Sequence, residues 1–228
     1  MTPHAERVLV VERAFARPRP QLVPRRVPRS WHVFKRVADV VLAGSALIVL
    51  SPVIALAALG VACVSSGSPL FLQERVGRNG ERFKLYKLRT MVDGAHLYHD
   101  DLRALNEVDG PVFKIRNDPR LHPLGKLLRR TSIDELPNLI NVLRGEMSIV
   151  GPRPPLPSEV AHYDDYARRR LSVKPGITCL WQVSGRSNLL FDEWMRLDNL
   201  YIDTWTPLGD LAIVAKTVPA VLRGEGAH

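Results

Sequence analysis

Cysteine is scarce in this chain, which has 228 residues and only two cysteines, Cys63 and Cys179. Two cysteines so far apart, one of them inside an apolar stretch, exclude the disulfide framework that holds small secreted domains together. The seven histidines are scattered, so no cluster with the spacing of zinc ligands occurs. The composition therefore indicates a reduced protein that faces the cytosol.

Long hydrophobic runs are equally scarce, because only the segment between Val37 and Val64 is apolar enough to enter a bilayer. It begins too far from the N-terminus for a cleavable signal peptide and lacks a small-residue cleavage site. About 20 apolar residues suffice to span a bilayer, so a spanning helix is one prediction. The pair Ser51-Pro52 predicts a kink at its centre, where the Ser51 hydroxyl can satisfy the carbonyl that proline leaves free.

Basic residues flank the apolar run on both sides, which by the positive-inside rule places both ends in the cytoplasm. They are Arg29, Lys35 and Arg36 before the run, and Arg75, Arg78 and Arg82 after it. Each arm of a break at Ser51-Pro52 has about 12 residues, or roughly 18 Å of helix, less than a hydrocarbon core of about 30 Å. These features favour a re-entrant membrane helix over 35–66, with a spanning helix as the alternative.

Positive charge is concentrated at the N-terminus, where residues 1–36 hold nine Lys or Arg and two Glu within a chain of net charge +9. A basic arm before an apolar segment indicates contact with the anionic cytoplasmic leaflet. A nucleic-acid partner is not expected, because the arm lacks the aromatic interleaving of single-strand binders. Its prolines prevent a long helix, so the arm over 1–34 is predicted to be extended or disordered.

The sequence pattern of the remaining residues, 67–228, predicts a mostly α-helical domain with one small β-hairpin, which is an α+β fold. Apolar arms on either side of Asn79-Gly80 predict the hairpin within 69–91, and its second arm would place Lys87 and Arg89 on one face. Hydrophobic spacing and helix-ending residues predict the helices. They are expected over 96–106, 121–130, 136–143, 163–171, 192–205 and 208–222.

The most informative motif is a pair of adjacent carboxylates, Asp134 and Glu135, with Arg129 before it and Arg153 after it. Cations beside carboxylates suit a phosphorylated substrate, a divalent metal and a nucleophilic acid. Adjacent helical side chains point about 100° apart, so the two carboxylates would take separate roles. A structural interpretation stays open, in which Ser132 and Glu135 form a capping box or Asp134 is an N-cap.

Taken together, these motifs resemble the bacterial sugar transferases, the monotopic polyprenyl-phosphate hexose-1-phosphate transferases of the exopolysaccharide-initiating type. The resemblance runs in one order from Lys35 to about the end of the chain. Its matching stretches are Ser51-Pro52, Gln73–Gly77, Phe83–Met91, Thr131–Pro137, Ser148–Pro154, Val173–Thr178 and Trp181–Arg186. The chain departs from the family at Cys179, where a small residue such as glycine is expected.

The resemblance implies a protein of the bacterial inner membrane. Its helix would break at Ser51-Pro52 and re-enter the cytoplasmic leaflet, and amphipathic helices would hold the catalytic domain, 67–228, at the headgroup plane on the cytoplasmic side. It also implies transfer of a hexose-1-phosphate, glucose or galactose, from a UDP-sugar to undecaprenyl phosphate. UMP would be released, and exopolysaccharide or a related glycan would be initiated.

The same resemblance assigns roles to residues. Asp134 would be the nucleophile that forms a phosphosugar-aspartate intermediate, and Glu135 would hold Mg²⁺. The substrate would be bound by Arg153, Arg129, Lys87, Arg89 and Arg75. A homodimer is left open. The competing hypothesis, based on the basic arm, is a non-catalytic membrane-tethered adaptor that binds anionic lipid or nucleic acid.

Overall fold

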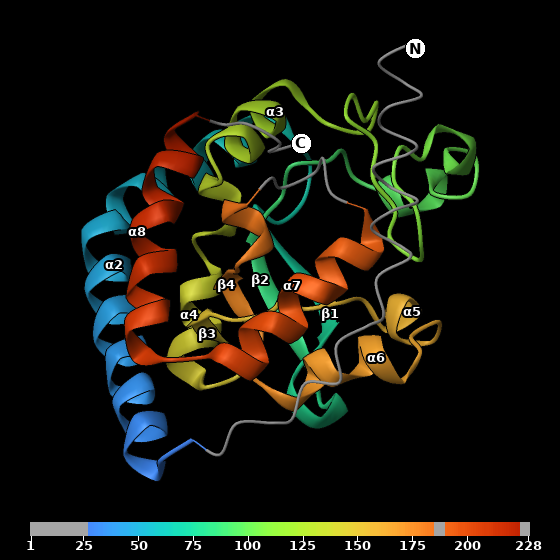
Figure 1. Ribbon diagram of the computed structural model, residues 1–228. Helices are drawn as coiled ribbons and strands as arrows, with labels where there is room; N and C mark the ends of the chain where they lie inside the picture. Colours follow the sequence, from blue (N-terminus) through green and yellow to red (C-terminus); the bar gives the residue numbers. More distant parts are fainter. Residues whose placement is uncertain (1–26, 185–189, 224–228) are drawn as a thin grey trace, which may run out of the picture.

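A computed structural model describes residues 27–184 and 190–223 of the chain (Figure 1). Its first element is the 36-residue helix α2, Arg29–Val64. The helix begins six residues before the predicted boundary at position 35, and most of the predicted disordered arm lies outside the described residues. By length and composition α2 is long and apolar enough to cross a membrane.

Helix α2 is one continuous helix with Pro52 inside it, so the predicted break at Ser51-Pro52 does not interrupt the helix. Proline has no N–H, so Pro52 cannot make the usual bond to the carbonyl of Ile48, four residues earlier. The Ser51 hydroxyl donates to this carbonyl instead, at 2.8 Å, as predicted. In Figure 1 the helix runs along one side of the domain, and its last part turns toward α3, Pro123–Arg130.

Charged side chains attach the first turns of α2 to the rest of the domain. Lys35 donates to the Val150 carbonyl at 3.0 Å and to Asp210 at 2.6 Å. Arg36 donates to two carbonyls at the end of α4, Asn138–Arg144, at 2.6 and 2.9 Å. Buried Asp39 accepts from a hydroxyl and an amide of strand β3, Ser148–Val150. Lys35 and Arg36 thus bind the protein itself and are not left for lipid headgroups.

The predicted β-hairpin is confirmed. Strand β1, Leu70–Val76, pairs antiparallel with β2, Arg82–Leu88, with Leu70 opposite Leu88. Asn79 and Gly80 both have positive φ values, of 59° and 83°, which the tight turn of a hairpin requires. The buried face of β2 packs with α4 and with Ala43 of α2 in one core cluster.

A second, parallel strand pair was not predicted from the sequence. Strand β3 pairs with β4, Gly176–Thr178. The two segments of the chain approach closely just beyond β3. A Cβ atom on Gly151 would lie 2.4 Å from the Lys174 carbonyl oxygen, so only glycine fits there. This pair positions the segment that continues from Gly151 to Arg153.

The other helices cover this core (Figure 1). They are α5, Pro157–Val160; α6, Asp165–Arg168; α7, Phe191–Thr204; and α8, Pro207–Arg223. The last two agree with prediction. The helix predicted over 96–106 is wrong, because that stretch forms two 3₁₀ turns, Ala95–Tyr98 and Arg103–Leu105. Further 3₁₀ turns are Arg78–Gly80, Ile133–Glu135, Arg169–Ser172 and Trp181–Val183.

Helices α2 and α8 lie side by side and leave large apolar side chains exposed (Figure 1). On α8 these are Leu208, Leu211 and Val218. On α2 they recur at helical spacing and include Val33, Val37, Val41, Ile48, Leu56 and Leu59. A contiguous exposed apolar surface marks an interaction site, for a protein or a membrane.

Candidate active site

The two adjacent carboxylates lie on the short 3₁₀ turn Ile133–Glu135, between α3 and α4. Ser132 enters this turn with φ of 56°, in the left-handed region that non-glycine residues rarely adopt. Its side chain makes no capping hydrogen bond, and α4 begins only at Asn138. Both capping interpretations are therefore wrong, and the strained residue Ser132 stands immediately before the turn that carries the carboxylate pair.

The Asp134 side chain is buried, with 6% of the residue exposed. Within residues 27–184 and 190–223 it makes no ion pair shorter than 4 Å. Burial and the neighbouring Glu135 carboxylate raise the pKa of Asp134 to about 6, against the opposing charges of Lys87 and Arg129. Asp134 is thus ionised at neutral pH, yet more basic and more nucleophilic than an ordinary aspartate.

Glu135 has the opposite electrostatic behaviour. Burial disfavours its charge, but Lys87 outweighs burial by charge and hydrogen bond, with help from Arg153 and Arg75, so the pKa of Glu135 is lowered. The Lys87 Nζ lies 3.1 Å from Glu135 Oε1. Two adjacent carboxyls with pKa values pushed apart can take different roles, one as nucleophile and one as a permanent anion.

Arg153 is fixed by its backbone and half-exposed at its guanidinium group. Its carbonyl accepts from Arg170 Nη2 at 3.0 Å, and Arg170 forms a buried ion pair with Asp198 of α7 at 2.7 Å. Its own Nη1 lies 3.8 Å from Glu159. Sequence reasoning missed Arg170 and assigned Asp198 no role, because only the fold brings these residues beneath Arg153.

Arg75, predicted to bind substrate, is buried and bonded to the protein. It donates to the Pro154 carbonyl at 3.0 Å and to Gln73 at 2.7 Å. Burial and the charge of Arg153 lower the pKa of Arg75 to about 9. Arg75 therefore holds the segment after Arg153 in place and adds positive potential at Glu135.

Arg129 lies near Asp134, whereas Arg89 does not. Arg129 donates to Thr90 at 3.1 Å and is among the charges that oppose the raised pKa of Asp134. Arg89 donates to the Ser66 carbonyl at 2.7 Å and to Asp93 at 3.1 Å. It ties the loop after α2 to the end of β2, whereas Lys87 pairs with Glu135.

Lys114 is a cation of this site that sequence reasoning missed. The pKa of Lys114 is lowered to about 8, mainly because the side chain is buried. The positive charges of Arg153, Arg129 and Arg116 lower it further. The charges of Arg153 and Arg129 therefore act on Lys114 as they act on the two carboxylates. Lys114 sits in irregular chain 20 residues before Asp134, where no periodicity or motif in the sequence indicated a role.

The match to known proteins spans most of the chain. The family described as bacterial sugar transferase matches residues 30–224. The chain belongs to the bacterial sugar transferase family. Its fold is mostly helical, with small sheets and one long apolar helix near the N-terminus.

Relatives within this family differ in length. The chain is 49% identical over 162 residues to galactosyl transferase CpsE of Streptococcus agalactiae, covering 71% of this chain and 36% of CpsE. It is 40% identical over 201 residues to ExoY, an exopolysaccharide production protein of Sinorhizobium fredii, covering 86% and 88%. A UDP-glucose:undecaprenyl-phosphate glucose-1-phosphate transferase of Caulobacter vibrioides is 42% identical over 207 residues, covering 85% and 72%. The chain thus spans well under half of CpsE and most of ExoY.

For a bacterial sugar transferase, the carboxylates in this site fit a magnesium ion. The described residues contain no group of three or more His, Cys, Asp or Glu side chains that could hold a metal by themselves. Mg²⁺ is usually bound through one or two carboxylates, with substrate phosphates and water completing its shell. Glu135, anionic and half-buried beside Asp134, provides such a partial set of ligands.

Proposed function

We propose that this protein transfers a hexose-1-phosphate from a UDP-sugar to undecaprenyl phosphate and releases UMP, the first membrane step of exopolysaccharide or related glycan assembly. The observation that carries the proposal is the adjacent carboxylate pair with separated pKa values, surrounded by cations. The printed names of the CpsE and Caulobacter relatives support transfer of galactose or glucose.

The proposed chemistry has two displacements at one phosphorus atom. An oxygen of ionised Asp134 attacks the β-phosphorus of the UDP-sugar, the bond to the bridging oxygen breaks, and UMP leaves with the electron pair. A phosphate oxygen of the lipid then attacks the same phosphorus, and the Asp134 carboxylate leaves. The covalent intermediate lets the soluble donor depart before the lipid acceptor arrives.

The surrounding residues would neutralise and position the phosphates, which is the main requirement of phosphoryl transfer. Arg153, on its anchored backbone, would clamp the diphosphate, and Arg129 and Lys114 would add positive charge. Glu135 would hold Mg²⁺, which would supply further charge neutralisation when bound. Lys87 keeps Glu135 ionised and oriented for that role.

We further propose that α2 re-enters the cytoplasmic leaflet of the inner membrane and does not span it. Both ends of the helix are bonded to one domain: Arg36 to α4 at the start, and the Ser66 carbonyl to Arg89 just after the end. An apolar helix whose two ends are held by one polar domain has both ends on the same side. Periplasmic labelling of single cysteines placed before Arg29 and after Val64 tests this, because labelling of exactly one end would contradict it.

The assay for the reaction is UMP release by the full-length protein in nanodiscs, with Mg²⁺, undecaprenyl phosphate and one UDP-sugar at a time. Lipid-dependent release with UDP-glucose or UDP-galactose is expected. If folded protein released no UMP with any donor, the result would contradict the proposal and favour the non-catalytic adaptor.

A further inference from the structure

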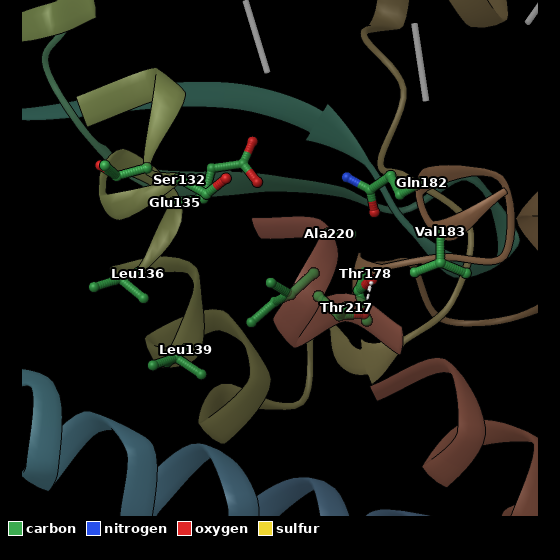
Figure 2. A pocket seen from close by; sticks show the side chains of 11 residues that line it. Ser132, Glu135, Leu136, Leu139, Thr178, Gln182, Val183, Thr217 and Ala220 are labelled. Carbon is green, nitrogen blue, oxygen red and sulfur yellow. Dashed lines mark hydrogen bonds between the residues drawn. The ribbon is translucent and has the colours of Figure 1, made fainter. Parts of the chain in front are cut away.

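A cavity of about 220 Å³ opens beside Glu135 (Figure 2). Its walls come from the 3₁₀ turn of the carboxylate pair, from α4 and β4, from the turn Trp181–Val183, and from α8. Five of its eleven lining residues are aliphatic, and most of the exposed lining surface is apolar. The aliphatic residues are Leu136, Leu139, Ile177, Val183 and Ala220. A cavity with such walls favours hydrocarbon over a polar ligand.

Three polar side chains in the lining, those of Thr178, Thr217 and Gln182, already bond to the protein. The hydroxyls of Thr178 and Thr217 lie 2.7 Å apart, and Thr217 also donates to the Ile213 carbonyl (Figure 2). The side-chain oxygen of Gln182 accepts from the Cys179 thiol at 3.2 Å. A nucleobase would need hydrogen-bonding groups directed at its edges, and the two threonine hydroxyls are taken up by each other and by the Ile213 carbonyl.

The position of the cavity connects the carboxylates to the apolar surface of the molecule. Glu135 and Gln182 lie on opposite sides of it in Figure 2. Helix α8 contributes Thr217 and Ala220 to the wall of the cavity. The same helix leaves Leu211 and Val218 exposed. The cavity therefore lies between a phosphate-binding site and the apolar surface of α2 and α8.

We propose that this cavity binds the first isoprenoid units of the acceptor lipid, next to the phosphate that reacts at Asp134. The inference rests on the function proposed above and adds a binding site for its second substrate. A lipid phosphate that reaches the carboxylate pair must direct its chain away from the surrounding cations, and the cavity is the aliphatic space that adjoins Glu135. Its volume, below the roughly 300–1,000 Å³ of whole-ligand pockets, suits a chain segment better than a nucleotide sugar.

The test fills the cavity from its α8 side with Ala220→Phe. The matched control is Ala215→Phe, which adds the same ring to an exposed position of the same helix outside the cavity lining. For Ala220→Phe we expect KM for undecaprenyl phosphate to rise about tenfold, with KM for the UDP-sugar changed less than about twofold. Exchange of labelled UMP into the UDP-sugar, which requires no lipid, should match wild type. Ala215→Phe should match wild type in all three measurements.

Two results would overturn the inference. An increase in KM for the UDP-sugar alone would assign the cavity to the donor, and unchanged KM values for both substrates would leave it without a substrate. If Ala220→Phe does not fold, Ala220→Asp places a charge in the lining without bulk, and the same rise in lipid KM is expected. Failure of the proposed function is distinguishable, because wild type itself would then show neither UMP exchange nor lipid-dependent release.

Discussion

Two groups of cations in this protein differ in what their charges contact. Lys35, Arg36 and Arg89 donate to carbonyls close to the ends of α2 and hold that helix to the domain, and the carboxylates that Lys35 and Arg89 also contact, Asp210 and Asp93, lie outside the candidate site. Lys87 and Arg153 instead lie close to carboxylates and act on the charge of Glu135. The comparison shows that basic residues hold segments together where helix ends and loops present unpaired carbonyls, and set the charge of the candidate site where they contact Glu135.

The largest expected effect is loss of the nucleophile. Asp134→Asn keeps the size of the side chain but removes the attacking oxygen anion, so UMP release should fall by about 10³-fold or more. The control is Asp101→Asn, an exposed position outside the site, which should retain wild-type turnover. Wild-type turnover in Asp134→Asn, measured in the nanodisc assay, would remove Asp134 from the mechanism.

The comparison of cations is tested by one substitution in each group. Arg153→Lys should lower kcat/KM for the UDP-sugar by about 10²-fold, because lysine cannot reproduce a two-pronged phosphate contact. The melting temperature of this variant should stay near that of wild type. Arg36→Lys loses one of two carbonyl bonds and should lower stability by about 1 kcal/mol with kcat/KM preserved. The opposite pattern, with the kinetic loss in Arg36→Lys, would contradict the division.

The pKa of Asp134 predicts a pH dependence. The nucleophile must be ionised, so kcat/KM should be flat above pH 6 and fall about tenfold per unit as pH drops below about 6. The raised pKa also means that the ionised form costs folding stability. The stability contributed by protonated Asp134 is present below its unfolded pKa and is lost as pH rises through about 6. Asp134→Asn should therefore raise the melting temperature more at pH 7 than at pH 4, as differential scanning fluorimetry would measure; an equal shift at both would argue against the raised pKa.

The smallest expected effect is at the proline of α2. Ser51→Ala removes the hydroxyl that satisfies the Ile48 carbonyl and should destabilise the protein by about 1 kcal/mol. Ser45→Ala is the control, because it is a serine of the same helix away from the proline. Thermal unfolding in nanodiscs would measure both variants, and equal effects would mean that the bond contributes nothing specific.

Local patterns in the sequence predicted the elements whose stability is local. Asn79-Gly80 fixes the hairpin turn, and apolar spacing fixes α7 and α8. The prediction of a helix over 96–106 was wrong, because the pattern there is polar and the residues form short turns instead of one helix. The parallel pair β3 and β4 could not be predicted, because three-residue strands carry almost no periodic signal.

The candidate site was predicted in outline only. Asp134, Glu135, Arg129, Arg153 and Lys87 are brought together as expected. The predicted substrate contacts of Arg75 and Arg89 stay predictions, and the bonds that these two residues make to the Pro154 and Ser66 carbonyls could not be predicted, because a guanidinium group binds whichever carbonyls the fold presents to it. That information lies in three-dimensional proximity and not in the neighbouring sequence.

The attachment of α2 has a mechanical consequence. Lys35 holds the Val150 carbonyl, three residues before Arg153, and Asp39 holds the strand that leads there. The first turns of the apolar helix and the segment that leads to Arg153 are therefore bonded to each other directly. If α2 enters a bilayer as proposed, these bonds would fix the distance between Arg153 and the lipid headgroups, so the soluble donor and the lipid phosphate would meet at a constant depth.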